Sequence, residues 1–232
     1  MIKSIPKIIH YIWMGDQSKL EKYSQNIETW KIKNPDYNLI LWDETQFLKY
    51  DNAKFYIDRG YFSQASDLMR FSILKDHGGW YLDTDVICHK SLNDFLNKEF
   101  VIGYSAFNFI NFTIIGAVPN NEYITELFNC FNKYTIPTER LEIELNYKNK
   151  KYIIPNSSDF IGTKFLEIYD PNFKAYPEDY FLNNDGNKQI THNTYCEHIL
   201  EKIEIFDKID ISQLQKSNMT LRDIKEYYMK MG

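Results

Sequence analysis

Hydrophobic and polar positions in the first part of the chain follow two periods, one typical of buried strands and one typical of amphipathic helices. Residues Lys7 to Trp13 form a β-branched and aromatic run that predicts a buried strand. Ser18 can cap a helix over Lys19 to Lys33, in which apolar residues recur every three or four positions. A second apolar run, Tyr37 to Trp42, predicts the next strand. The order strand, helix, strand indicates the start of a parallel α/β sheet.

The next part of the chain repeats this arrangement around a pair of glycines. Apolar positions from Ser63 to His77 follow helical spacing, and Gly78-Gly79 supply the stop that a left-handed helix cap requires. Residues Trp80 to Val86 then predict a strand that ends in two acids, Asp83 and Asp85. Functional residues of open α/β sheets collect at the carboxyl ends of strands, so these acids mark the expected site.

The rest of the chain is less regular. Two further strands and two further helices are predicted, at Phe100 to Tyr104, Phe112 to Val118, Glu122 to Tyr134 and Asp159 to Ile168. Residues 138–151 are charged and weakly patterned, which predicts an exposed excursion, and residues 220–231 predict a terminal helix. Because no repeat or linker interrupts the 232 residues, we expect a single α/β domain with a mostly parallel central sheet.

Composition excludes several classes of function. Lys and Arg total 27 and Asp and Glu total 32, so the net charge is −5 and nucleic acid is not an expected partner. No apolar run reaches the ~20 residues that cross a bilayer, although peripheral membrane contact stays open. The three cysteines fit no zinc spacing, and no signal peptide is evident. The predicted location is the cytoplasm, with the inner face of the cell membrane as an option.

The two acids predict a metal site. Carboxylates two residues apart on a strand point to the same face, and they can converge only where positive charge compensates them. They supply the hard oxygen ligands that Mg²⁺ or Mn²⁺ prefers and leave coordination positions open for diphosphate oxygens. The preceding glycines, a buried-looking helix that carries Asp67 and Arg70, and an upstream strand that ends in Trp13 make the combination more specific than D-x-D alone.

Three blocks of sequence resemble a known family. They are IPKIIHYIWMG (Ile5 to Gly15), the W-x-x-x-N-P-x-Y-x-x-x-x-W-D pattern (Trp30 to Asp43) and ASDLMRFSILKDHGGWYLDTDV (Ala65 to Val86). They resemble bacterial and fungal glycosyltransferases of the capsular-polysaccharide and mannosyltransferase type, which have a D-x-D sugar-binding region. The glucosylating domain of large clostridial toxins is a more distant likeness. The resemblance covers the first ~85 residues, and it implies a GT-A, Rossmann-like nucleotide-sugar-binding domain.

The resemblance also implies how the donor is bound. Trp13 is expected to stack on the nucleotide base through its flat indole face. Asp67 corresponds to an acid that holds hydroxyls of the donor sugar, and Arg70 to a base that contacts sugar or phosphate. Tyr81 resembles a residue that lines the donor pocket, and Asn111 is expected to face the same pocket.

The implied metal site combines the acid pair with a late histidine. Asp83 is expected to reach the ribose and the metal shell, and Asp85 to bind the Mn²⁺ or Mg²⁺ ion directly. His192 is the expected third ligand, with His198 as the alternative. Asp83, Asp85 and Arg70 are the expected catalytic residues, because they organise charge around the leaving group.

The implied reaction moves a hexose from a nucleotide diphosphate sugar, expected to be UDP-linked, to a saccharide or lipid-linked acceptor. The resemblance implies retention of anomeric configuration and a role in bacterial surface polysaccharide or glycoprotein glycan synthesis. Two alternatives stay open: a protein that binds nucleotide sugar or carbohydrate without turnover, and a metal-dependent hydrolase whose two carboxylates flank a scissile bond.

Overall fold

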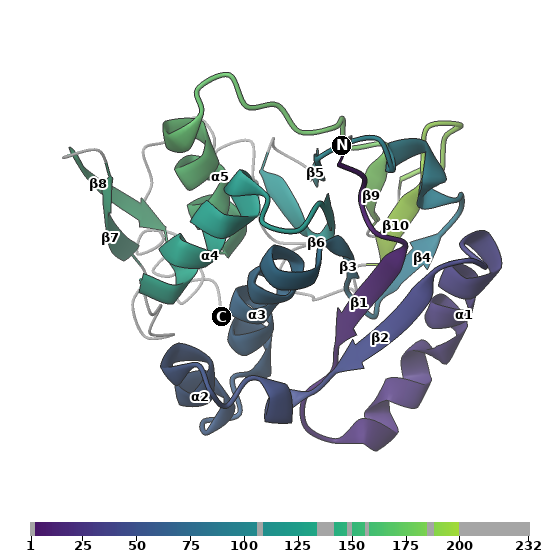
Figure 1. The fold of residues 1–232 in the computed structure, drawn as a ribbon, viewed down its shortest axis with the longest axis horizontal. Helices are drawn as coiled ribbons and strands as arrows, with labels where there is room; N and C mark the ends of the chain where they lie inside the picture. Colours follow the sequence, from purple (N-terminus) through teal and green to yellow (C-terminus); the bar gives the residue numbers. More distant parts are fainter. Residues whose placement is uncertain are drawn as a thin grey trace, which may run out of the picture.

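A five-stranded sheet forms the centre of the computed structural model, which describes residues 3–105, 109–133, 142–147, 150–155, 158–184 and 188–199 (Figure 1). The strand order is β2-β1-β3-β6-β5. β1 pairs in parallel with β2 and β3, whereas β6 pairs antiparallel with β3 and β5. The predicted, mostly parallel α/β sheet is therefore confirmed, with β6 as its reversed strand. These strands are β1 (Ile8–Ile12), β2 (Asn38–Trp42), β3 (Gly79–Leu82), β5 (Phe100–Tyr104) and β6 (Ile110–Ala117).

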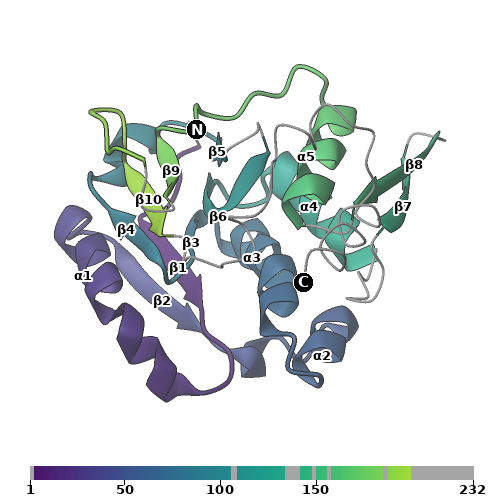
Figure 2. The same cartoon turned by 180° about the vertical axis from the view of Figure 1, so that it is seen from behind.

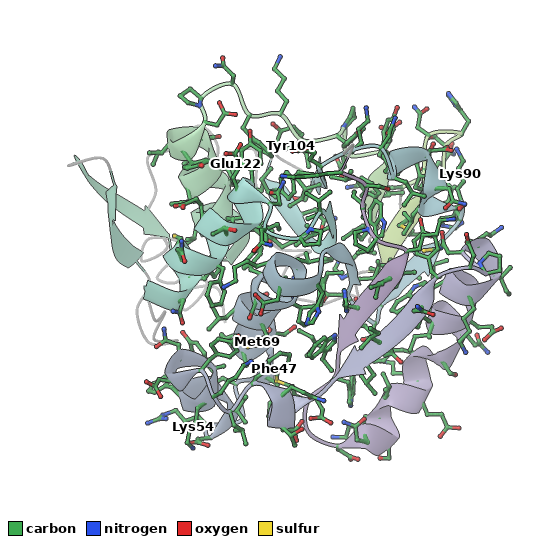
Figure 3. All side chains as sticks on the ribbon, in the orientation of Figure 1. Phe47, Lys54, Met69, Lys90, Tyr104 and Glu122 are labelled. Carbon is green, nitrogen blue, oxygen red and sulfur yellow. The ribbon has the colours of Figure 1, made fainter. Side chains whose placement is uncertain are left out.

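Helices and a second sheet cover the two faces of the central sheet (Figures 1 and 2). Side chains alternate along β3, so that Tyr81 joins a core with α2 to α5 while Trp80 joins a core with α1 and the second sheet. In Figure 3, Phe47 and Met69 lie inside the first core, and Lys54 on α2 lies at the surface. The helices are η1 (Gln17–Tyr23), α1 (Ser24–Lys33), η2 (Glu44–Gln46), α2 (Asp51–Ile57), α3 (Phe62–His77), η3 (Leu92–Phe95), α4 (Glu122–Lys133) and α5 (Ser158–Tyr169).

The second sheet has the order β4-β10-β9, and it brings together segments that are far apart in the sequence. It contains β4 (Val86–Cys88), β9 (Phe181–Asn184) and β10 (Cys196–Ile199). β10 pairs antiparallel with β4 and parallel with β9. Cys88 and Cys196 stand opposite each other as free, buried thiols with their sulfur atoms 3.4 Å apart. The sequence did not predict this sheet, because its pairing depends entirely on long-range contacts.

The single strand predicted from Trp80 to Val86 is wrong. The chain leaves the central sheet after Asp83, whose amide still donates to the Thr113 carbonyl at 2.9 Å. The Val86 amide then donates to the Asp83 carbonyl at 3.1 Å, which closes a turn. The two acids therefore flank a turn between β3 and β4 and do not share one strand face.

The first predicted helix is divided in two. A 3-10 helix, η1, precedes the α-helix α1, and Asp16 caps η1 where Ser18 was predicted to cap the whole helix. The Asp16 carboxylate accepts hydrogen bonds from the amide and the hydroxyl of Ser18, so the serine serves the cap as a donor.

Two predictions concern segments beyond the central sheet. The excursion predicted at 138–151 overlaps an antiparallel pair, β7 (Glu142–Tyr147) and β8 (Lys150–Pro155). The terminal helix predicted at 220–231 lies outside the described residues. Within the described ranges, every helix is too short or too polar to span a bilayer.

A buried histidine connects β1 to the glycine pair that precedes β3. His10 is fully buried, its Nδ1 accepts a hydrogen bond from Trp42 Nε1 at 3.1 Å, and its Nε2 lies 2.9 Å from the Gly78 carbonyl. Burial lowers the pKa of His10 from 6.5 to about 4, although the Gly78 carbonyl opposes the shift, and nearby His77 lowers the pKa further. His10 therefore stays neutral in the folded chain under conditions that protonate it in the unfolded chain.

This histidine is expected to make the fold sensitive to acid. Because the folded pKa is depressed, the stabilisation is fully present above pH 6.5 and is lost as the pH falls toward about 4. The loss from this group is about 3 kcal/mol. Urea denaturation at pH 7 and pH 4.5 measures the free energy of unfolding. This free energy should change less with pH in His10→Gln than in the wild type, because the glutamine amide cannot titrate. Equal pH dependence of the two proteins would exclude His10 as the source.

Candidate active site

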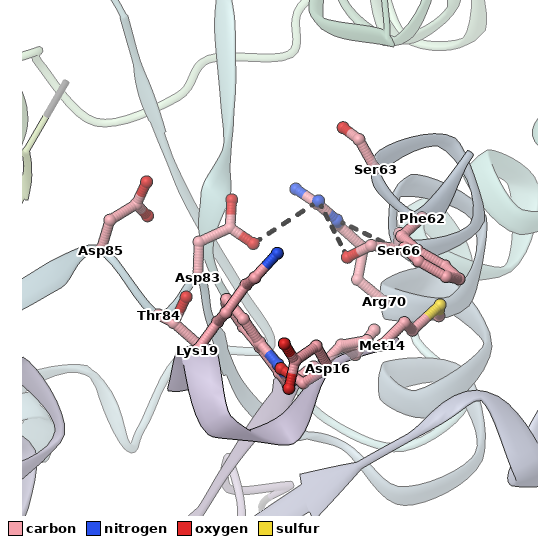
Figure 4. Close-up of a pocket in the computed structure, with 12 residues that line it drawn as sticks. Met14, Asp16, Lys19, Phe62, Ser63, Ser66, Arg70, Asp83, Thr84 and Asp85 are labelled. Atoms are coloured by element: carbon pink, nitrogen blue, oxygen red, sulfur yellow. Dashed lines mark hydrogen bonds and ion pairs between the residues drawn. The ribbon is translucent and has the colours of Figure 1, made fainter. Parts of the chain in front are cut away.

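A cleft of about 420 Å³ opens where β1 and β3 end (Figure 4). Three segments line it: the loop and η1 that follow β1, the start of α3, and the turn between β3 and β4. The lining residues are Ile12, Trp13, Met14, Asp16, Lys19, Phe62, Ser63, Ser66, Arg70, Asp83, Thr84 and Asp85. Trp13, Arg70, Asp83 and Asp85 are thus brought together at the predicted edge of the sheet.

Helix α1 fixes the turn that carries the acids. The Asn26 side-chain amide donates to the Thr84 carbonyl at 3.1 Å, and Trp30 Nε1 donates to the Val86 carbonyl at 2.7 Å. The Thr29 hydroxyl accepts a hydrogen bond from the Cys88 amide at 2.9 Å. Backbone groups that leave the ladder at the turn are therefore satisfied by one helix, which holds the turn in place.

Asp83 is held from behind by two side chains. The Tyr81 hydroxyl donates to Asp83 Oδ1 at 2.5 Å, and Arg70 Nη2 lies 3.5 Å from the same oxygen. Burial raises the pKa of Asp83, Arg70 lowers it, and the charge of Asp85 raises it again, with a net upward shift. The carboxyl group is therefore fixed in direction, and its negative charge lacks full compensation from the protein.

Asp85 forms a compact group with a histidine from β10. Asp85 Oδ2 lies 3.2 Å from His198 Nε2, and the Ile199 amide donates to the Asp85 carbonyl at 3.0 Å. One ligand atom each from Asp83, Asp85 and His198 lie within 4.8 Å of one another. Asp85 Oδ1 is buried and has no hydrogen-bond partner within the part of the chain that the structure describes. Since buried carboxylate oxygens are normally paired, this donor set fits a small divalent cation such as Mn²⁺ or Mg²⁺.

The structure does not bring His192 to the acids. Its side chain is exposed in the loop before β10, and its backbone carbonyl accepts a hydrogen bond from the Lys90 side chain. His198, the alternative in the sequence analysis, stands opposite Val86 in the register of β4 and β10. His198 is therefore the third member of the group, because the pairing of β4 with β10 places it opposite Val86, the residue that follows Asp85.

Arg70 is buried, and its guanidinium donors are mostly engaged by protein groups, so few of them can contact a ligand. Its Nη1 donates to the Phe112 carbonyl at 2.7 Å, its Nη2 lies 2.8 Å from Asp67 Oδ1, and its Nε donates to the Ser66 carbonyl at 3.3 Å. Burial lowers the pKa of Arg70, but the charge of Asp83 and smaller contributions outweigh burial, so the net shift is upward. The guanidinium is thus permanently charged and mostly engaged within the protein.

The remaining predicted residues lie at different depths. Trp13 is half-buried at the cleft, where its Nε1 donates to the Asp16 carbonyl at 3.0 Å and its ring packs against Tyr23. Asp67 and Tyr81 are behind the cleft lining, against Arg70 and Asp83.

Asn111 is placed away from the cleft lining. Its side chain is 1% exposed, its Nδ2 donates to the Phe181 carbonyl at 3.3 Å, and its Oδ1 accepts from the Thr113 amide at 2.9 Å. The expectation that Asn111 faces the pocket is not supported by this position, because a β6 side chain at that depth serves the contact between the two sheets.

One acid near the site was missed. Asp159 begins α5, and its backbone carbonyl accepts a hydrogen bond from the Thr163 hydroxyl at 2.6 Å. Burial and the charge of Asp67 raise the pKa of Asp159 to about 7, while Arg70 opposes the shift. The sequence carried no signal for this residue, since an acid in the first turn of a helix is ordinary.

The architecture matches a solved glycosyltransferase. The PaToxG glycosyltransferase superposes with a TM-score of 0.55 and 22% sequence identity, over 73% of this chain and 70% of that chain. The chain has a GT-A fold. In this GT-A fold, the acid pair follows β3 at the carboxyl end of the parallel strands, the position expected for ligand contacts in open α/β sheets.

Sequence comparison agrees with this GT-A assignment. Residues 21–101 match the model of the glycosyltransferase sugar-binding region containing a DXD motif. An uncharacterized glycosyltransferase of Acanthamoeba polyphaga mimivirus is 37% identical over 145 residues, which cover 53% of this chain and 54% of that protein. Inositol phosphoceramide mannosyltransferase 1 of Schizosaccharomyces pombe is 26% identical over 178 residues, which cover 66% of this chain and 54% of that protein.

These comparisons confirm the predicted relation to DXD-containing glycosyltransferases. The chain spans about half the length of the two relatives. Those two relatives are viral and fungal, so the bacterial capsule setting stays a prediction from the sequence.

Proposed function

We propose that this protein is a metal-dependent glycosyltransferase, which transfers a hexose from a nucleotide diphosphate sugar to a saccharide or lipid-linked acceptor. The observation that carries the proposal is the buried Asp85 Oδ1, which has no partner among the described residues and lies beside Asp83 and His198 at a cleft in a GT-A fold. The relation to glycosyltransferases over residues 21–101 supports the same activity.

The protein's own residues would act mainly by position and charge. Asp83, Asp85 and His198 would hold Mn²⁺ or Mg²⁺, and the ion, when bound, would supply positive charge against the departing diphosphate. The Tyr81 hydroxyl and Arg70 fix the direction of the Asp83 carboxylate. Arg70 also fixes Asp67, which would accept hydrogen bonds from donor-sugar hydroxyls. Trp13 would stack on the base at the cleft.

The geometry favours transfer over the hydrolytic alternative. Glycosidase carboxyl groups stand ~5 to 9.5 Å apart so that a scissile bond fits between them. Here one oxygen each from Asp83 and Asp85 and one nitrogen from His198 lie within 4.8 Å of one another. This arrangement suits one shared cation better than a pair of groups on opposite sides of a bond.

The finer parts of the proposal follow from the family resemblance. A UDP-linked donor, retention of configuration and a role in bacterial surface glycan synthesis belong to it as expectations. A mannosyl donor and a lipid acceptor are suggested by the name of the fungal relative, inositol phosphoceramide mannosyltransferase 1. Cytoplasmic location with contact at the inner membrane face is a further expectation.

A ligand screen followed by product analysis tests the activity. Mn²⁺ together with a nucleoside diphosphate or its sugar should raise the melting temperature more than either ligand alone, because binding stabilises the folded state by mass action. Donor sugars that shift the melting temperature are then incubated with and without acceptor. Transfer product with acceptor supports the proposal; nucleotide release that ignores acceptor indicates a hydrolase, and binding without release indicates a non-catalytic protein.

The identity of the third ligand has a separate test. His198→Ala is expected to weaken Mn²⁺ binding about tenfold or more, because one of three ligand atoms is removed. His192→Ala, which changes a histidine of the same loop and strand region, is expected to keep wild-type Mn²⁺ affinity. Titration calorimetry in the presence of UDP measures both proteins. The reverse pattern would restore His192 as the ligand.

A further inference from the structure

The charges of the cleft do not balance for a diphosphate ligand. Among the cleft-lining residues, the acids are Asp16, Asp83 and Asp85, and the cations are Arg70 and Lys19. Even with one divalent ion between Asp83 and Asp85, a bound nucleoside diphosphate would bring further negative charge. A cation that reaches the phosphates would offset this charge, and among the residues that the structure describes the cleft lining offers two candidates.

Arg70 is poorly suited to that contact. It is 5% exposed, and Phe112, Asp67 and Ser66 already engage its donors at 2.7, 2.8 and 3.3 Å. Its contact with Asp83 orients a carboxylate of the metal group. To reach a phosphate, the guanidinium would have to give up buried hydrogen bonds, which is costly because the abandoned groups stay buried.

Lys19 has the opposite character. Its side chain is exposed, and Figure 4 shows it extending from η1 into the cleft, on the side where Asp83 and Arg70 lie. An ammonium on a flexible four-carbon stem can follow a phosphate, and it presents three donors without a fixed direction. In the described structure the side chain gives up no buried contact when it moves.

The backbone below Lys19 is fixed by local contacts. The Asp16 carboxylate caps η1 through the Ser18 amide at 3.0 Å, and the Lys19 amide donates to the Asp16 carbonyl at 3.2 Å. The same carbonyl accepts from Trp13 Nε1 at 3.0 Å. The Trp13 side chain, which is expected to stack on the nucleobase, and the Lys19 backbone are therefore bound to the same carbonyl group.

We propose that Lys19 binds the diphosphate of the nucleotide-sugar donor and acts with the metal ion to neutralise it. This inference rests on the proposed function and deepens it, since it names the cation that recognises the leaving group. Arg70 on α3 is then a positioning residue for Asp67 and Asp83, and Lys19 on η1 makes the contact with phosphate.

The test is nucleotide binding by the full chain with Lys19→Met, measured by titration calorimetry in saturating Mn²⁺. The probes are UDP and GDP, with UMP and GMP as their monophosphate counterparts. Lys19→Met is expected to weaken binding of the diphosphates about five- to tenfold, the scale of one net hydrogen bond made by an exposed side chain. Binding of the monophosphates by Lys19→Met should weaken less. Lys19→Arg should restore most of the diphosphate affinity.

Lys22→Met is the matched control. Lys22 lies on the same 3-10 helix, but it is absent from the cleft lining and its ammonium stands over the Tyr23 ring. It is expected to bind all four nucleotides as the wild type does. Melting temperatures of the variants verify that each is folded.

The possible failures are distinguishable. If the wild type binds UDP or GDP and Lys19→Met binds them equally well, the inference is wrong while the proposed function stands. Equal losses for monophosphates and diphosphates would also overturn it, because the contact would then not be with the diphosphate. If the wild type binds none of the four probes, the proposed function fails and the inference fails with it.

Discussion

Replacing Asp85 with asparagine is expected to lower the transfer rate about 100- to 1000-fold. The variant keeps the shape of the side chain but removes the charge from the group of Asp83, Asp85 and His198, so the cation that offsets charge on the leaving group binds poorly. Initial rates at saturating Mn²⁺ and donor measure the effect, and Mn²⁺ titration measures the lost affinity. Full transfer activity in Asp85→Asn would refute the metal assignment.

The loss of activity should occur without loss of stability. Among the described residues Asp85 Oδ1 has no hydrogen-bond partner, and the substitution weakens one contact, that of Oδ2 with His198 Nε2 at 3.2 Å, so the free energy of unfolding is expected to change by about 1 kcal/mol or less. Asp76→Asn is the control, since Asp76 is an exposed acid at the end of α3, outside the cleft. It should retain both activity and metal affinity. An Asp85→Asn protein that is unfolded would show that the acid is structural.

Replacing Arg70 with methionine is expected to destabilise the protein by about 3 to 5 kcal/mol. The substitution removes the charge that Asp67 and Asp83 face, and it leaves the Phe112 carbonyl without its donor. Breaking a buried ion pair from one side has this cost because the remaining charges stay buried. Urea denaturation at pH 7 gives the free energy of unfolding. A cost below about 1 kcal/mol would contradict this structural role of Arg70.

A control variant and a double variant test whether lost charge compensation causes the instability of Arg70→Met. Arg59→Met is the control, because Arg59 is exposed and its Nη1 donates to the carbonyl of Phe55, four residues earlier in the chain. The substitution should cost about 1 kcal/mol or less. If Arg70→Met does not fold, the double variant Asp67→Asn/Arg70→Met should be more stable, since one uncompensated charge is gone. Failure of the second substitution to help would indicate that packing, and not charge, is the cause.

Much of the central sheet could be predicted because its signals are local. The apolar run of β1, the periodic helix α3 and the glycines before β3 each show their structure in a few consecutive residues. The glycines are required by geometry, since Gly78 and Gly79 have φ angles of 63° and 93°. The spacing of Asp83 and Asp85 predicted that the two acids lie close together, and their ligand atoms do lie within 4.8 Å of each other, although a turn and not a shared strand face brings them there.

The second sheet could not be predicted, and the errors at the site follow from that. No glycine or proline marks the turn at Thr84, so the run from Trp80 to Val86 has the pattern of one strand. The choice of His198 over His192 depends on which residue of β10 stands opposite β4. The hydrogen bonding of Arg70 is also a tertiary property, because Arg70 lies on α3 and its acceptor, the Phe112 carbonyl, lies on β6.

The pairing of β10 with β4 has a consequence for how the site is assembled during synthesis. The acids leave the ribosome early, within the stretch that resembles other glycosyltransferases, whereas the imidazole of His198 emerges much later. Until β10 arrives, the edge of β4 that pairs with it is open, and unpaired strand edges invite association with other chains. A nascent chain would therefore need protection, by its own later segments or by a chaperone, for as long as that edge is open.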